Sequence, residues 1–115
     1  MSGVADTQFS VTVLPLDERM CVIVAGELDL ATAGRIEAEV AALLDAGCAV
    51  VEIDLRALEF IDSSGIHELL RCRDRAADRG VLLRLLLVPG PVLRALTICA
   101  VLDRFDVEVA GEAPG

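Results

Sequence analysis

A pair of serines lies where a strand-like pattern gives way to a helix-like one, in the run Phe-Ile-Asp-Ser-Ser-Gly over residues 60–65. A serine at the start of a helix can accept hydrogen bonds from the free N–H groups of the first turn, and those N–H groups can equally receive a phosphoryl oxygen. We therefore interpret Ser63 as a helix cap, as a modification switch, or as both.

A second polar turn follows an earlier apolar run, in the sequence Gly-Glu-Leu-Asp over residues 26–29. If the strands before the two turns are parallel neighbours, Asp29 and Ser63 lie together at the edge where open α/β sheets place their functional loops. Asp29 and Asp62 would then stand beside a serine that starts a helix. Caps and turns use the same residue types, so a purely structural role for all three stays open.

An enzyme hypothesis starts from Ser63 and the single histidine, His67, which lies about one helical turn further on. A serine hydrolase needs an oriented base and an oxyanion hole, and the nucleophile pattern G-x-S-x-G does not occur. The chain has no lysine and no glycine-rich phosphate loop, and Asp62, His67 and Glu68 do not form a metal-ligand pattern. We expect no catalytic residue, no bound cofactor or metal, and an exposed His67.

The net charge of the chain excludes some classes of binding partner. The 115 residues carry 19 acidic and 10 basic side chains, every basic one an arginine, for a formal charge of −9. Such a surface repels nucleic acid and anionic membranes. The longest apolar run, residues 81–88, is too short to cross a bilayer, and residues 1–10 lack the pattern of a signal peptide. We expect a cytoplasmic protein that binds neither nucleic acid nor membrane.

The four cysteines, Cys21, Cys48, Cys72 and Cys99, are evenly spread, with no C-x-x-C pair and no histidine beside them. A disulfide framework would need an oxidising compartment, which nothing in the sequence indicates. We expect the cysteines to be reduced, mostly buried small hydrophobic residues without a function of their own.

Hydrophobic periodicity divides the chain into alternating strands and helices. Strands are predicted at residues 9–13, 20–25, 49–55, 81–88 and 105–109, the second of them covered on both faces, and helices at residues 32–46, from the serine pair to Gly80, and at 91–100. Pro15 and Gly26 are predicted to end the first two strands. Asp29 or Thr32 is predicted to cap the first helix, Gly47 suits its C-terminal turn, and Glu68 falls off the apolar stripe of the second helix.

The element order β-β-α-β-α-β-α-β, without repeat or long linker, predicts a single α/β domain over residues 1–115 with flexible ends at 1–7 and 111–115. The alternation from residue 20 onward implies parallel strands joined by crossover helices. The alternating first strand belongs at an antiparallel edge. The predicted architecture is a mixed, mostly parallel sheet packed by three to four helices.

The two polar turns, taken together, resemble those of the STAS family, and within it those of the small anti-sigma factor antagonists of bacteria. The run over residues 26–29, with Thr32 after it, is similar to the family's first signature, and the run over residues 60–66 is similar to its second, at family-like separation. The stretch from Pro91 to Leu96 also fits the family's third helix. The resemblance covers nearly the whole chain.

The resemblance implies a partner-switching regulator of transcription, in processes such as stress response or sporulation. The unmodified protein would bind an anti-sigma factor that is also a serine kinase with its own ATP and Mg²⁺, and so release a sigma factor. Ser63 matches the phosphoacceptor, with Ser64 as the alternative. The other residues matched to the partner surface are Glu27, Asp29, Thr32, Asp62, Ser64, Gly65 and His67. A phosphatase that resets the protein stays open, as does a STAS module that is never phosphorylated and uses Ser63 only as a cap.

One stretch departs from the family pattern. At the end of the third helix the family has a small residue and glycine before a leucine, whereas this chain has Ala100, Val101 and Leu102. A β-branched residue cannot take the left-handed conformation that glycine adopts at low cost. We therefore expect a different exit from this helix and an altered kinase contact there.

Overall fold

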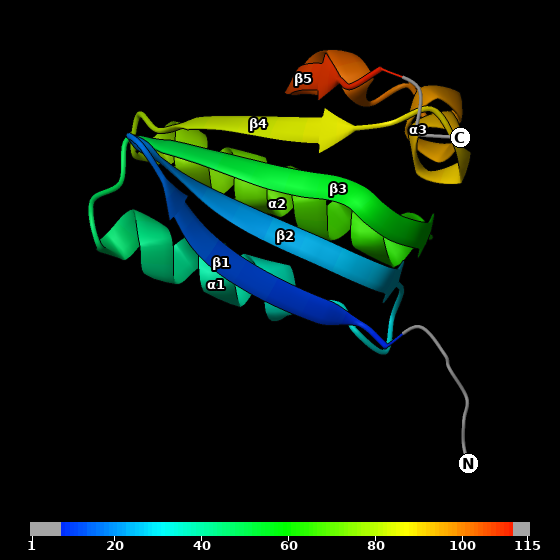
Figure 1. Ribbon diagram of the computed structural model, residues 1–115, viewed down its shortest axis with the longest axis horizontal. Coiled ribbons are helices and arrows are strands. Elements are labelled where there is room, and N and C mark those ends of the chain that lie inside the picture. Colours follow the sequence, from blue (N-terminus) through cyan, green and yellow to red (C-terminus); the bar gives the residue numbers. More distant parts are fainter. Residues whose placement is uncertain (1–7, 112–115) are drawn as a thin grey trace.

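The structure, a computed structural model, describes residues 8–111. The flexible ends expected at residues 1–7 and 111–115 lie outside this range, except for residue 111. The elements follow the predicted order, with one added 3-10 turn (Figure 1). The strands are β1 (Ser10–Leu16), β2 (Arg19–Leu28), β3 (Val50–Ile61), β4 (Leu82–Leu87) and β5 (Asp106–Val109); the helices are α1 (Arg35–Asp45), α2 (Ser63–Asp78) and α3 (Pro91–Ile98), with η1 (Leu102–Arg104) as the 3-10 turn.

The five strands form one sheet in sequence order, β1-β2-β3-β4-β5. β1 pairs antiparallel with β2, and every later pair is parallel. The predicted mixed sheet with an antiparallel edge strand is thus confirmed. Pro15 lies inside β1 and does not end it, because an edge strand has a side on which a missing N–H removes no ladder hydrogen bond.

Helices α1 and α2 lie side by side across one face of the sheet (Figure 1). Alternate strand side chains point toward these helices and form the core with them: Val22, Val24, Val51, Ile53, Leu55, Leu83, Leu85 and Leu87 from the strands, and Ile36, Val40, Leu69 and Cys72 from the helices. The prediction that β2 is covered on both faces is wrong, since Figure 1 shows no helix in front of β2 and β3, and Ile23 and Ala25 are only half-buried. On that face Glu52 and Asp54 are buried beneath the arginines with which they pair, Arg19 at 3.3 Å and Arg56 at 3.0 Å.

Gly26 lies inside β2, at an irregularity in its register with β3, and does not end the strand as predicted. Its φ is 99°, and a Cβ at this position would lie 2.7 Å from the Cα of Phe9. Glycine is required here because the backbone before β1 approaches so closely. The irregularity lets β2 continue to Leu28, which pairs with Ile61 at the end of β3.

All three helices end in the same hydrogen-bonded turn, with a left-handed residue after the helix. Gly47 and Gly80 take that position after α1 and α2, as the sequence predicts. After α3 it falls on Ala100, whose φ is 59°, and Val101 N–H closes the turn on Leu96 O at 3.2 Å. Val101 itself has an ordinary φ of −110° and is buried in the core. The expectation that Val101 changes the exit from this helix is therefore wrong, because Ala100, and not Val101, takes the left-handed conformation.

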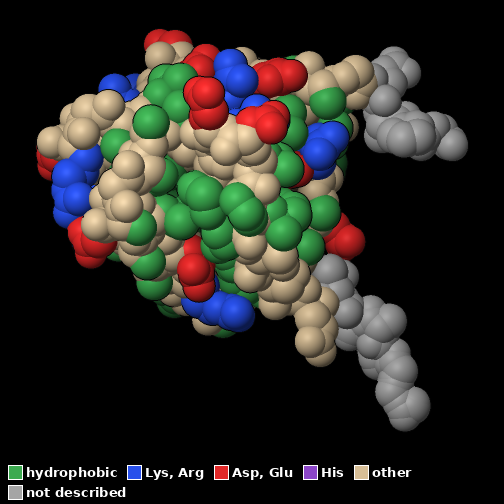
Figure 2. Space-filling model, turned by 60° about the vertical axis from the view of Figure 1, so that its left-hand side comes forward, with side chains coloured by type: hydrophobic (Ala, Val, Ile, Leu, Met, Phe, Trp, Pro, Cys, Tyr) green, Lys and Arg blue, Asp and Glu red, His purple; other side chains and the backbone are tan. Residues whose placement is uncertain are grey.

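The sheet end opposite α3 brings together the β1–β2 turn and the amino ends of β3 and β4. Figure 2 is turned so that this end comes forward, and it shows hydrophobic side chains gathered between groups of acidic and basic ones. A shallow hollow of about 670 Å³ at this end is lined by Asp17, Glu18, Arg19, Val50, Leu82 and Arg84. Ser63 lies at the other end of the sheet, where β3 leads into α2.

Candidate functional site

The two polar turns leave the sheet side by side. β2 and β3 are parallel neighbours whose last paired residues are Leu28 and Ile61, and Asp62 N–H donates to Leu28 O at 3.2 Å. The turns that follow therefore start at the same edge of the sheet. This is the edge at which open α/β sheets carry their functional loops.

Asp62, and not Ser63, caps α2. Its backbone is extended, and its Oδ1 accepts hydrogen bonds from Ser64 N at 2.9 Å and Gly65 N at 3.2 Å. The prediction of Ser63 as the cap is wrong, because Ser63 is already the first helical residue. Ser63 is exposed, and within residues 8–111 its hydroxyl makes no hydrogen bond.

The turn after β2 is closed by its own side chains. Asp29 Oδ1 accepts from Ala31 N at 3.0 Å and Thr32 N at 3.3 Å, while Thr32 Oγ1 donates to Glu27 O at 2.9 Å and accepts from Asp29 N at 3.0 Å. Neither Asp29 nor Thr32 caps α1 as predicted, because the helix starts only after Gly34, which stands at its N-cap with a φ of 99°. The two side chains instead fix the shape of the turn.

Gly65 lets α2 begin close to the strands. A Cβ at this position would lie 2.7 Å from Leu28 Cγ and 2.8 Å from Ile61 Cγ1. Its φ lies outside the left-handed region, so glycine is needed here for space and not for conformation. The close approach packs the first turn of α2 against the end of β2.

Among residues 8–111, three acidic side chains at the end of β2 and in the turns after β2 and β3 have no arginine partner. Glu27 is exposed, and Asp29 and Asp62 are partly exposed. The ion pairs formed among residues 8–111 all lie elsewhere. We call Glu27, Asp29 and Asp62 the acidic rim; its uncompensated charge favours a basic surface on a binding partner.

His67 is exposed one helical turn beyond Ser63, as the sequence predicts. No hydrogen bond joins the two side chains in the part of the chain that the structure describes. Over the same range no three metal-ligating side chains cluster, and no helix is long and apolar enough to cross a bilayer.

A buried carboxyl that the sequence interpretation missed joins the two helices. Glu68, predicted to lie off the apolar stripe of α2, is 0% exposed. Its Oε2 accepts from Glu37 N at 2.8 Å in the first turn of α1, and its Oε1 has no partner among the described residues. Glu68 thus supplies from α2 the cap that Gly34 cannot provide. Its position four residues before Cys72, a cysteine expected to be buried, was a sequence signal for the burial of Glu68 but not for its partner on α1.

The Glu37 side chain is bound by α2 as well. Its two carboxylate oxygens accept from Arg71 Nε at 2.9 Å and Arg75 Nε at 2.8 Å. Burial acts to raise the pKa of Glu37, but hydrogen bonds from Arg71 and Arg75 outweigh it and lower that pKa below its ordinary value. The backbone N–H of Glu37 binds Glu68 and its side chain binds Arg71 and Arg75, so both hold the start of α1 against α2.

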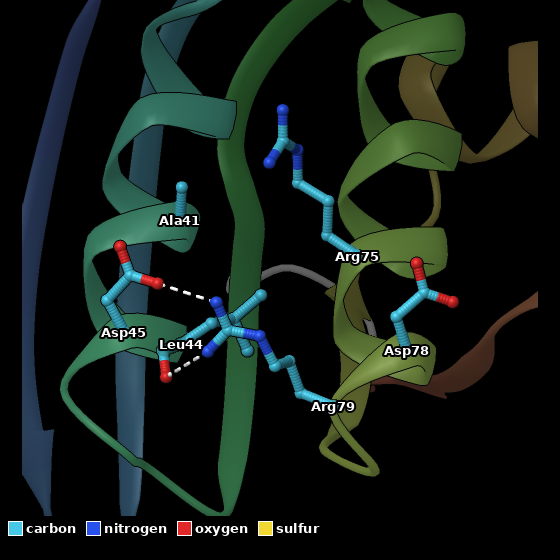
Figure 3. A pocket seen from close by; sticks show the side chains of 6 residues that line it. All are labelled: Ala41, Leu44, Asp45, Arg75, Asp78 and Arg79. Atoms are coloured by element: carbon cyan, nitrogen blue, oxygen red, sulfur yellow. Dashed lines mark hydrogen bonds and ion pairs between the residues drawn. The ribbon is translucent and has the colours of Figure 1, made fainter.

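The other end of α1 is also capped from α2. Arg79 donates to Leu44 O at 3.0 Å and pairs with Asp45 Oδ1 at 2.6 Å (Figure 3). A guanidinium at this end matches the free carbonyls and the negative end of the helix dipole. The hollow beside it, about 170 Å³, lies far along α2 from Ser63. Helix α2 therefore carries Ser63 at its own start and holds both ends of α1.

The cysteines are free, and their burial differs from one to the next. Cys21 and Cys72 are buried, Cys48 is half-buried and Cys99 is exposed. Burial is the main cause that raises the pKa of Cys72 to about 12. The prediction of mostly buried cysteines holds for Cys21 and Cys72 and is wrong for Cys48 and Cys99; none of the four forms a disulfide in the structure.

Solved structures of anti-sigma factor antagonists have the same fold. An anti-sigma factor antagonist from Mycobacterium paratuberculosis is 22% identical to this chain, with a TM-score of 0.78 over 87% of this chain and 85% of that one. The anti-sigma factor antagonist SpoIIAA, solved in its unphosphorylated form, is 24% identical, with a TM-score of 0.59 over 90% of this chain and 89% of that one. At these identities the likeness shows the fold alone.

Comparison with curated proteins gave no match. The family model of the STAS domain matches residues 9–110, a range that contains both polar turns and every strand and helix of the structure. The resemblance drawn from the two signatures is thereby confirmed, and the chain belongs to the STAS domain family.

Proposed function

We propose that this STAS domain is an anti-sigma factor antagonist that works by partner switching. Unphosphorylated, it binds an anti-sigma factor that is also a serine kinase, and a sigma factor is released for transcription in the cytoplasm. Phosphorylation of Ser63 by that kinase, which brings its own ATP and Mg²⁺, abolishes the binding. Family membership and the likeness to solved antagonists support this class of partner.

The free hydroxyl of Ser63 is the observation that carries the proposal. Ser63 is exposed on the first turn of α2, and Asp62 serves as the cap, so no capping bond of α2 competes for the hydroxyl. A serine that capped the helix would have to give up those bonds before it could be modified. Ser64 is partly buried, which makes it the second candidate acceptor.

A phosphoryl group on Ser63 would change the surface while the fold is retained. It adds about −1.5 to −2 charges at neutral pH, and the start of a helix stabilises negative charge. The acidic rim already gives this surface uncompensated negative charge. A partner surface that fits the neutral serine would be repelled by the added charge and would have to remove water from the phosphoryl group. A penalty of about 3 to 4 kcal/mol lowers affinity by two to three orders of magnitude.

The main alternative is a STAS interaction module that is never phosphorylated. In the simplest form of this alternative Ser63 caps α2, but in the structure the cap is Asp62. The hydrolase alternative requires a base for Ser63, and His67 makes no hydrogen bond to it among the described residues. These observations favour a chain that acts by binding and is itself a kinase substrate.

The proposal can be tested by incubating the protein with ATP and a kinase and then analysing its peptides by mass spectrometry. The kinase to use is the ATPase-type serine kinase whose gene lies nearest to the gene of this protein. We expect a mass increase of about 80 Da, one phosphoryl group, that fragment ions locate at Ser63. Ser63→Ala should abolish the increase, whereas Ser10→Ala, an exposed serine on β1, should not. An increase that persists in Ser63→Ala would move the acceptor to Ser64, and no increase in the wild-type protein would contradict phosphoryl control.

A further inference from the structure

Two large apolar side chains are exposed near the start of α2, one in the turn after β2 and one near the end of β3. Leu30, the residue after Asp29, is 80% exposed, and Phe60, two residues before Asp62, is 45% exposed. Neither belongs to the motif residues assigned above to the partner surface. The other exposed large apolar side chains belong to other parts of the structure: Leu14, Leu16, Leu82, Ile98 and Val109.

Leu30 is exposed on a turn whose backbone is held in place. The hydrogen bonds of Asp29 Oδ1 to Ala31 N at 3.0 Å and of Thr32 Oγ1 to Glu27 O at 2.9 Å close the chain on both sides of it. A turn that is already closed loses little freedom when a partner covers it. An apolar side chain with this exposure gains more from being covered than one already half-buried.

Phe60 is placed by the sheet. It pairs with Glu27 in the register of β2 and β3, while the next pair, Leu28 and Ile61, is buried. Because strand side chains alternate, Phe60 and Glu27 point away from that buried pair. Leu30 and Phe60 therefore lie with the acidic rim at the end of the sheet where α2 and Ser63 begin.

We propose that Leu30 and Phe60 are the apolar anchors of the interface with the kinase-type anti-sigma factor, and that they enter an apolar pocket edged with arginine or lysine. The inference rests on the proposed function. Exposed leucine and phenylalanine select an apolar pocket, and the unpaired charges of the rim select a basic edge. The phosphoryl group on Ser63 would then arise beside the anchors, where the partner has to approach most closely.

Isothermal titration calorimetry of the unphosphorylated protein with the kinase-type anti-sigma factor tests the anchors. We expect Leu30→Ala to weaken binding about tenfold or more, which corresponds to ~1.4 kcal/mol. Phe60→Ala should weaken it in the same direction. Leu82→Ala is the matched control: Leu82 is 49% exposed at the start of β4, at the opposite end of the sheet, and its replacement should change affinity by less than about twofold.

Kinetics of phosphorylation distinguish an anchor from a merely structural residue. Leu30→Ala should raise the kinase's KM for this protein about tenfold and leave kcat unchanged, because the anchor contributes equally to the ground state and the transition state. Circular dichroism and the thermal midpoint should match those of the wild-type protein. If Leu30→Ala and Phe60→Ala bind the kinase as tightly as the unphosphorylated wild-type protein, while phosphorylation at Ser63 still weakens binding, the anchors are wrong and the proposed function stands. If the wild-type protein does not bind the kinase at all, the proposed function fails and the anchors with it.

Discussion

Replacing Glu68 by alanine removes the link between α2 and the start of α1. The Glu37 N–H would lose its acceptor at 2.8 Å in a site that water does not reach, since Glu68 is 0% exposed. A buried N–H without a partner costs about 1–3 kcal/mol, and the one lost methylene costs about 0.8 kcal/mol. We expect Glu68→Ala to lower the free energy of unfolding by about 2 to 4 kcal/mol.

Glu68→Gln separates the hydrogen bond from the carboxyl group. Glutamine keeps the shape and one acceptor oxygen for Glu37 N–H, and it replaces the other oxygen, which has no partner among the described residues. We expect a loss of about 1 kcal/mol, from a weaker interaction with the start of α1. Urea unfolding measures both variants, with Glu39→Ala, an exposed glutamate of α1, as a control within about 0.5 kcal/mol of wild type.

Hydrogen exchange locates the effect. In Glu68→Ala the amide of Glu37 should lose protection before the sheet does, because the first turn of α1 opens locally. A loss below about 1 kcal/mol in Glu68→Ala, or equal losses in the alanine and glutamine variants, would refute the idea that Glu68 caps α1.

Three further measurements address other parts of the fold. Ala100→Gly should raise the free energy of unfolding by about 1 kcal/mol, because glycine takes the left-handed φ of 59° with little strain; a decrease in urea midpoint would contradict this. Iodoacetamide on the native protein should label the exposed Cys99 and spare Cys72, whose pKa burial raises to about 12; mass spectrometry that finds both labelled at equal rates would argue against the packing. The lowered pKa of Glu37 stabilises the fold above its unfolded-state pKa, so the stability difference between wild type and Glu37→Gln should be present at neutral pH and vanish as pH falls through the lowered value; a difference independent of pH would exclude the arginine contacts as its cause.

The sheet and the meeting of the two turns could be predicted because they depend on periodicity and on chain topology. The alternation of Phe9, Val11 and Val13 marked the edge strand, and the strand–helix alternation after it implied parallel neighbours. Those two statements are sufficient to bring Asp29 and Ser63 to one edge. Pattern alone therefore located the candidate site.

Local hydrogen bonds could not be predicted in the same way, because several neighbouring residues can serve equally well. Asp62 and Ser63 are both good caps, and only the backbone conformation decides that Asp62 has this role. Thr32 and Asp29 are likewise suited to cap a helix, yet they close the turn before it. The choice depends on where the helix starts, which periodicity defines only within a few residues.

Contacts between helices could not be predicted from the sequence for another reason. Glu68 is a charged residue type that is rarely buried without a partner, and its partner, the N–H of Glu37, is a backbone group 31 residues away in the chain. Gly34 gave no sign that the cap would come from another helix. Only the packing of α1 on α2 reveals the pair.

The central claim is that charge on Ser63 separates this protein from its partner while the domain stays folded. The most direct measurement is the affinity of Ser63→Ala and Ser63→Asp for the kinase-type anti-sigma factor, with Ala42→Asp, at an exposed position near the end of α1 that lies away from Ser63, as a control for added charge elsewhere. Our account predicts tight binding by Ser63→Ala and Ala42→Asp, binding about a hundredfold weaker by Ser63→Asp, and a folded domain in all three. Equal affinities of Ser63→Ala and Ser63→Asp would contradict it.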